Sequence, residues 1–277
     1  MFHVKHPQLF FCRLFHVKHF LFLFSAFPLF SLQRPSTLVI ISEHKHFYLI
    51  WYFQKVGAPV AKTIAIVNQK GGVGKTTTCV NLAAALTEAG QRILLCDFDP
   101  QANSTSGMGV DKTVSKGIYD ALIGEVPVED ALVHTKYGDV LPSNKALAGA
   151  TIEMIALEQR EYRLKNALEQ VAEHYDYIFI DCPPSLELLT LNALCAADTV
   201  LVPVQCEYYA LEGLSDLLST IRIVKRSLNP KIALEGVVLT MYDGRTNLSM
   251  QVAEEVKRHF PGQVYATVIP RNVRLSE

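Results

Sequence analysis

The pattern of hydrophobic and polar positions from residue 61 onward is typical of alternating strands and helices. Short apolar runs, each ended by polar residues, predict buried strands, and longer stretches with apolar residues every three or four positions predict helices. The expected strands are 63–68, 92–97, 140–142, 175–181, 199–204, 232–240 and 264–269. The expected helices are 76–89, 147–174, 186–196, 211–228 and 249–260. This alternation predicts an α/β fold with a single doubly wound, mostly parallel sheet and helices on both faces.

A glycine-rich stretch lies between the first expected strand and the first expected helix. Residues 69–77 read Q-K-G-G-V-G-K-T-T. A phosphate-binding loop requires this context, because glycines let backbone N–H groups turn toward an anion and the helix N-terminus adds partial positive charge. In such a loop Lys75 would reach the β- and γ-phosphates, and the Thr76 hydroxyl would ligate Mg²⁺.

The loop departs from the standard pattern because Gln69 replaces the first glycine, and a second lysine, Lys70, follows it. The stretch K-G-G-V-G-K-T-T resembles the deviant Walker A motif of the ParA/MinD family of P-loop ATPases. The resemblance implies that Lys70 reaches across an ATP-dependent homodimer to the partner's phosphates, much as an arginine finger does. It implies an ATP-binding set of Lys70, Gly71, Gly72, Val73, Gly74, Lys75, Thr76 and Thr77.

Two of the expected strands end in an aspartate. The strand 92–97 continues into D-F-D-P-Q-A-N-S-T, and the strand 175–181 ends in D-C-P-P-S. Carboxyl ends of parallel strands line the ligand crevice. These segments resemble the family's D-x-D-P-Q-x-N loop and its Walker B strand. By that resemblance Asp99 orients the attacking water and is catalytic with Lys70 and Lys75, whereas Asp97 and Asp181 join Thr76 in holding Mg²⁺.

The C-terminal half carries a further resemblance. Residues 205–214, Q-C-E-Y-Y-A-L-E-G-L, are similar to the signature of the chromosomal Soj branch. The resemblance implies that Met241, Pro270 and Arg271 flank adenine. It also implies that Arg245 and Arg274 bind double-stranded DNA without sequence preference.

Charge and cysteine content limit the remaining possibilities. Residues 1–60 hold six of the 26 Lys and Arg residues but one of the 27 acidic residues, which leaves 61–277 with a net charge of −6. A domain with this negative net charge does not bind polyanions over its whole surface, so any DNA contacts must come from a local basic patch. The six cysteines form no C-x-x-C pair, and we expect reduced thiols.

The resemblance spans about residues 61–277 and implies an ATP-hydrolysing switch for chromosome or plasmid partitioning. ATP would drive dimerisation and non-specific DNA binding on the nucleoid in the cytoplasm. A ParB-like partner would stimulate a weak intrinsic hydrolysis and so release the DNA. Three alternatives stay open. The first is a MinD-like membrane ATPase, which needs a C-terminal amphipathic helix that this chain does not reach. The second is a metabolic enzyme, such as a reductase iron protein or a ligase. The third is an inactive truncated remnant.

We expect both ends of the chain to differ from those of relatives. Residues 1–60 hold eleven of the 14 Phe, and the pentapeptide F-H-V-K-H occurs at 2–6 and again at 15–19. Back-translation of this repeat gives an inverted repeat that resembles a bacterial centromere-like site. We therefore expect a spurious or disordered extension, translated from upstream DNA, with the true start at Val60. At the other end, relatives continue beyond Glu277, so the ATPase domain 61–277 is expected to be truncated.

Overall fold

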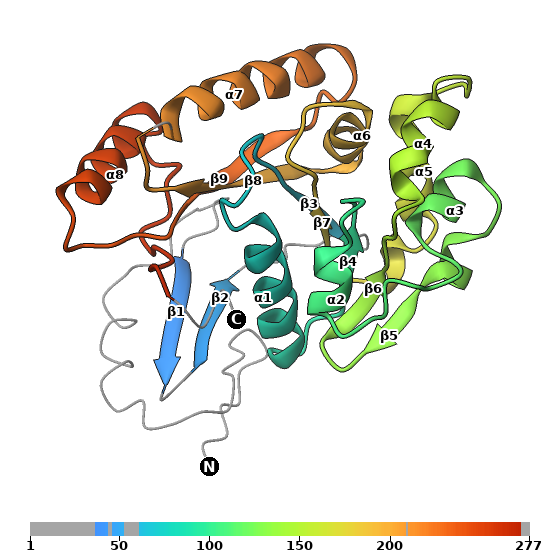
Figure 1. Cartoon of the computed structure of the whole chain (residues 1–277), viewed down its shortest axis with the longest axis horizontal. Coiled ribbons are helices and arrows are strands. Elements are labelled where there is room, and N and C mark those ends of the chain that lie inside the picture. The colour runs from blue at the N-terminus through green and yellow to red at the C-terminus, as the bar shows by residue number, and fades with distance from the viewer. Residues whose placement is uncertain (1–36, 44–45, 53–60, 209, 273–277) are drawn as a thin grey trace, which may run out of the picture.

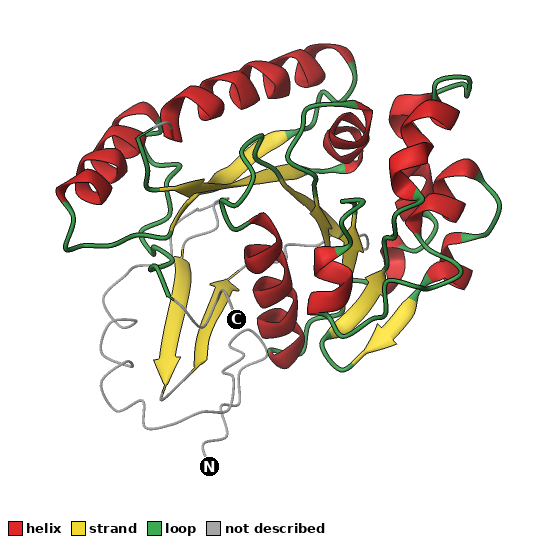
Figure 2. Cartoon of the chain, viewed as in Figure 1, coloured by secondary structure: helices red, strands yellow, loops and turns green. Residues whose placement is uncertain are grey.

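The computed structural model describes residues 37–43, 46–52, 61–208 and 210–272, and its centre is a seven-stranded sheet (Figures 1 and 2). The strand order is β5-β6-β4-β7-β3-β8-β9, and every neighbouring pair is parallel except the β5–β6 hairpin. The strands are β3 (Lys62–Ile66), β4 (Ile93–Asp97), β5 (Val133–Thr135), β6 (Gly138–Leu141), β7 (Tyr177–Asp181), β8 (Thr199–Gln205) and β9 (Ala233–Thr240). The expected fold class is confirmed.

Helices cover both faces of this sheet (Figure 2). The helices are α1 (Lys75–Glu88), α2 (Asn103–Gly107), α3 (Ile118–Ile123), α4 (Leu147–Met154), α5 (Arg163–Glu169), α6 (Leu188–Ala196), α7 (Ala210–Ser227) and α8 (Asn247–His259). On one face, Leu82 and Leu86 of α1 pack with Ile64 and Phe179 of the strands. Helices α3 to α8 contribute buried residues to the other face. Because the central strands are buried on both sides, they read as continuous apolar runs.

Strand register brings the two aspartates together. Strand β4 pairs with β7 so that Asp97 lies opposite Asp181, and β7 pairs with β3, whose carboxyl end leads into the glycine-rich loop. The loop and both aspartates therefore lie at one edge of the sheet, as the parallel arrangement requires.

Two expected elements are wrong in detail. The expected helix 147–174 is divided into α4, α5 and two short 3₁₀ helices, η2 (Arg160–Tyr162) and η3 (Ala172–His174), and Gln159 at φ 51° interrupts it in the left-handed region. In place of the expected strand 264–269, the structure has two isolated bridges, one between Val264 and Val237 of β9 and one between Pro270 and Tyr242. The Tyr265 N–H donates to the Val237 carbonyl, and the Ile269 N–H donates to the Leu239 carbonyl. The segment therefore uses four residues to pass two residues of β9, and no continuous ladder forms.

The remaining third 3₁₀ helix, η1 (Val128–Ala131), and a separate hairpin complete the described elements. The hairpin joins β1 (Thr37–Glu43) to β2 (His46–Tyr52) beside α1 (Figure 1), in a region where the sequence shows no periodicity. The repeated pentapeptides and Val60 lie outside the described residues, so the start at Val60 stays a prediction.

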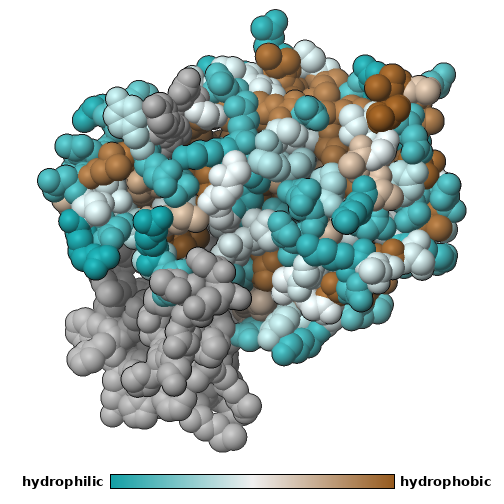
Figure 3. Space-filling model, in the orientation of Figure 1, coloured by the Kyte–Doolittle hydropathy of each residue, from teal (hydrophilic) through white to brown (hydrophobic). Residues whose placement is uncertain are grey.

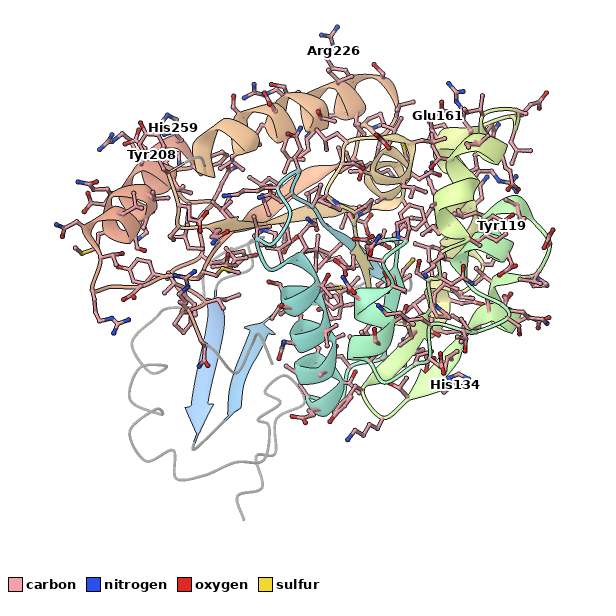
Figure 4. All side chains as sticks on the ribbon, viewed as in Figure 1. Tyr119, His134, Glu161, Tyr208, Arg226 and His259 are labelled. Carbon is pink, nitrogen blue, oxygen red and sulfur yellow. The ribbon has the colours of Figure 1, made fainter. Side chains whose placement is uncertain are left out.

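The distribution of surface hydropathy and the burial of the cysteines are those of a packed domain. Figure 3 shows mainly hydrophilic residues with smaller hydrophobic areas between them, and in Figure 4 Arg226 of α7 points away from the sheet. The five cysteines among the described residues are free and buried, as expected for reduced thiols. In the described part of the chain, no helix is both long and apolar enough to cross a bilayer.

Candidate functional site

Asn68 holds the N-terminal end of the glycine-rich loop. The Asn68 side-chain amide donates to the Pro203 carbonyl at 2.7 Å, and its oxygen accepts the Lys70 N–H at 2.9 Å. Gly72 and Gly74 have φ angles of 74° and 91°, which side chains with a Cβ rarely adopt. Helix α1 begins immediately after Gly74, so its unpaired N–H groups face the loop. The backbone geometry is that of an anion-binding loop.

Lys75 lies at the base of this loop. Its side chain is buried, and Nζ donates to the Lys70 carbonyl at 3.1 Å. Burial lowers the pKa of Lys75, and the carboxylates of Asp181 and Asp99 partly oppose that change. The structure therefore brings Lys75, Asp99 and Asp181 together, as the sequence predicts, and a bound polyanion would favour the charged amine further.

Asp97 holds the loop that carries Asp99. One of its oxygens accepts both the N–H and the hydroxyl of Thr105 at 2.7 Å, and the other accepts the Asp99 N–H at 3.2 Å. Burial raises the pKa of Asp97, and the Thr105 hydrogen bonds oppose this rise. Both oxygens thus have protein donors, which fixes the loop geometry. A direct part in holding magnesium stays a prediction for Asp97.

Asp181 is buried without such donors. It is 1% exposed, and neither carboxylate oxygen has a hydrogen-bond partner among the described residues; the buried hydroxyl of Ser104 also has none. Burial first, and then the charge of Asp97, raise the pKa of Asp181 to about 7, although the nearby hydroxyls of Thr76 and Ser104 act against this. Mg²⁺ prefers oxygen ligands, and carboxylate and hydroxyl oxygens next to a phosphate loop fit that ion.

Asp181→Asn is expected to stabilise the protein without nucleotide. The carboxyl has a folded pKa near 7 against an ordinary value of 3.8, so its burial destabilises the fold progressively as the pH rises from about 4 to 7. The variant should raise the free energy of unfolding by about 1–3 kcal/mol at pH 8 and by less at pH 5. Urea denaturation in chelator at both pH values measures this. A variant less stable than the parent at pH 8 would contradict it.

Lys70 makes an ion pair within its own chain. Its Nζ lies 2.9 Å from Glu207 Oε2, and Gln205 donates to the other Glu207 oxygen. Both charged side chains are about half exposed, at 40% and 45%. An exposed pair of this kind contributes only about 0–1 kcal/mol, so Lys70 can leave Glu207 for a stronger anion at little cost.

The predicted adenine-flanking residues lie side by side. Met241 follows β9 with φ 50°, a left-handed turn. The Tyr242 N–H donates to the Ile269 carbonyl, and the Arg271 N–H donates to the Tyr242 carbonyl. These bonds bring Met241 and the segment with Pro270 and Arg271 to the same place. Contact of these residues with adenine stays a prediction.

Arg245 is paired with Asp243. Its Nε and Nη2 donate to the two Asp243 oxygens at 2.9 and 2.7 Å, although the arginine side chain is 89% exposed. The guanidinium and the Arg245 N–H lower the pKa of Asp243 to about 2. Arg274, the other expected DNA contact, lies outside the described residues, so its part in DNA binding stays a prediction.

Three contacts of this site escaped the sequence analysis. They are the Thr105 hydrogen bonds to Asp97, the ion pair of Glu207 with Lys70, and a hydrogen bond from Thr240 to Val73. Thr105 and Glu207 lie inside motifs that the sequence analysis quotes, so their polar side chains could have indicated a role at the site. Thr240 gave a weaker signal, a hydroxyl at the carboxyl end of an expected strand.

The chain is similar to known proteins along most of its length. A family model described as an AAA domain matches residues 61–234. The sporulation initiation inhibitor protein Soj of Bacillus subtilis is 59% identical over 221 residues, which are 79% of this chain and 87% of that protein. The chromosome partitioning protein ParA of Myxococcus xanthus is 54% identical over 223 residues, 79% of each protein.

A solved structure has a similar fold. The cobyrinic acid a,c-diamide synthase of Mycobacterium smegmatis, with bound ATP analogue and magnesium, has a TM-score of 0.74 and 43% identity, covering 77% of this chain and 88% of that one. Fold, loop geometry and sequence identity agree. The chain belongs to the ParA/Soj family of chromosome-partitioning ATPases.

Proposed function

We propose that this chain is an ATP-hydrolysing switch for chromosome or plasmid partitioning. The observation that carries the proposal is the buried amine of Lys75, which lies at the base of the glycine-rich loop close to the unpaired carboxylate of Asp181. The reaction is ATP + H₂O → ADP + phosphate. Its products differ in charge from ATP at the loop, so the loop can distinguish the two states.

Each residue has a defined part in this proposal. Lys75 and the loop N–H groups hold the phosphates, and Asp99 orients water toward the terminal phosphate. Thr76 and Asp181 would hold Mg²⁺, with Asp97 supporting them. When bound, the ion neutralises charge on the phosphate oxygens. The protein's own contribution is positioning, because phosphoryl transfer needs little covalent chemistry from side chains.

Dimerisation is the output of ATP binding in this proposal. Lys70 leaves Glu207 and reaches the phosphates bound by a second copy of the chain, which makes hydrolysis depend on the dimer. The weak exposed ion pair supports this step, because little free energy holds Lys70 in place. A ParB-like protein then stimulates hydrolysis, and the dimer separates.

DNA binding follows from pairing two copies. Arg245, with Arg274, would contact backbone phosphates of nucleoid DNA, and a dimer doubles these contacts. Four neutralised phosphates predict a slope of about −3.6 for log K against log salt concentration, without base preference. The exposure of Arg245 supports this assignment, and its pairing with Asp243 predicts that DNA must compete with that carboxylate.

Asp243→Asn should therefore strengthen DNA binding. An opposite charge at contact distance in water is worth about 1 kcal/mol, or about fivefold in affinity. Filter binding of the ATP-loaded parent and variant to a random-sequence duplex at low salt measures the difference. Glu255→Gln, which removes the carboxylate partner of Arg258 on α8, is a matched control expected to change affinity less. Weaker binding by the Asp243 variant would contradict the expectation.

Phosphate release tests the proposed function as a whole. The parent protein with Mg²⁺ and ATP should release phosphate slowly, and duplex DNA together with a ParB-like protein should accelerate it. ATP binding without release under any of these conditions would favour the inactive remnant.

A further inference from the structure

Thr240, the last residue of β9, holds the phosphate loop from a distant part of the chain. Its hydroxyl donates a 2.8 Å hydrogen bond to the Val73 carbonyl, across 167 positions of sequence. Both residues are 2% exposed. A buried carbonyl needs a partner, so this bond fixes the direction in which the Val73 carbonyl points.

The direction of that carbonyl also fixes the N–H of the next residue. The Val73 C=O and the Gly74 N–H belong to one peptide plane, and none of the described peptide bonds is cis. In a trans unit the two groups point in opposite directions. Because Thr240 holds the carbonyl toward β9, the Gly74 N–H points away from β9. Gly74 immediately precedes α1, where N–H groups stabilise an anion.

Thr240 is itself firmly placed. It pairs with Gln205 in the β8–β9 ladder, and its carbonyl accepts the Cys206 N–H at 3.2 Å. Its methyl group lies 3.7 Å from the position that a Cβ on Gly74 would take, an ordinary van der Waals contact. The hydroxyl bonds to the loop and sets the orientation of the peptide, whereas the methyl group only lies beside Gly74.

We propose that Thr240 is a positioning residue for ATP binding. Its hydroxyl keeps the Val73–Gly74 peptide turned so that the Gly74 N–H faces the phosphates. The inference rests on the proposed nucleotide site, and Thr240 acts through Val73 without touching the nucleotide. If the hydroxyl is removed, the peptide can rotate, and its carbonyl then faces the phosphates in place of a donor.

Three variants of Thr240 separate the hydroxyl from the methyl group. Valine keeps the shape and removes the hydroxyl, alanine removes both, and serine keeps the hydroxyl. Binding of fluorescent ADP and of a non-hydrolysable ATP analogue, with Mg²⁺ and below the unfolding transition, gives the affinities. Loss of one hydrogen bond should weaken both nucleotides by about three- to tenfold in the Val and Ala variants. Ser should bind within about twofold of the parent.

Thr87→Val is the matched control. The Thr87 hydroxyl also donates to a distant backbone carbonyl, that of Tyr137 at 2.9 Å, but at the other end of α1. This variant should lose stability without losing nucleotide affinity. An equal loss of affinity in Thr87→Val would reduce the Thr240 effect to general loosening and overturn the inference.

The outcomes are distinguishable. A parent protein that binds neither nucleotide contradicts the proposed function. A parent that binds, with Val and Ala variants of equal affinity, or with a Ser variant as weak as Val, overturns the inference alone. If the Val variant does not fold, the comparison of Ala with Ser decides the question.

Discussion

Lys75→Ala is expected to abolish measurable ATP binding. The amine lies at the base of the loop, where burial lowers its pKa and the nearby carboxylates of Asp181 and Asp99 partly restore it, so it is held ready for a polyanion. Hydrogen bonds from a charged group contribute about 1.5–3 kcal/mol each, and contacts with two phosphates predict a loss of at least about 100-fold. Isothermal titration with an ATP analogue and Mg²⁺ measures it.

Lys70→Ala serves as the control in the same loop. Lys70 is half exposed and pairs with Glu207, so its removal should leave ATP binding by a single copy close to that of the parent. It should instead remove ATP-dependent dimerisation and hydrolysis. If Lys75→Ala bound ATP within about threefold of the parent, the assignment of this loop as the phosphate site would be wrong.

Arg245→Ala is expected to separate DNA binding from ATP hydrolysis. The guanidinium is exposed and lies in the loop after β9, and its only described ion-pair partner is Asp243. With two of four phosphate contacts removed from a dimer, the salt slope should fall from about −3.6 to about −1.8. DNA retention should drop strongly at physiological salt, whereas intrinsic phosphate release should not change.

The matched control is Arg258→Ala, another exposed arginine that pairs with a carboxylate on its own element, Glu255. It should change neither the slope nor retention to the same degree. An Arg245 variant that retains DNA like the parent, with an unchanged slope, would remove this residue from the DNA interface.

The local part of the site could be predicted from the sequence. The glycine-rich loop depends on residues adjacent in the chain, and strand–loop–helix order is visible in the apolar pattern. Asp97 and Asp181 could also be placed at one edge, because the ends of parallel strands meet there. These features require no knowledge of which residues face each other across the fold.

The contacts that depend on tertiary register could not be predicted. The pairing of Thr240 with Val73 joins residues 167 positions apart, and the apolar pattern of β9 does not say which hydroxyl reaches which carbonyl. The same limit explains the segment 264–269, whose apolar residues are compatible with a strand although its spacing against β9 is not. The break at Gln159 follows from a left-handed residue that helical periodicity does not reveal.

The mass of the protein in solution tests the central claim most directly. Light scattering coupled to size exclusion, with a non-hydrolysable ATP analogue and Mg²⁺ at saturation, should give twice the mass of the 30.9 kDa chain. The ADP-bound protein and the ATP-bound Lys70→Ala variant should keep the mass of a single chain. A parent protein that stays monomeric with the analogue bound would contradict the proposed ATP-driven switch.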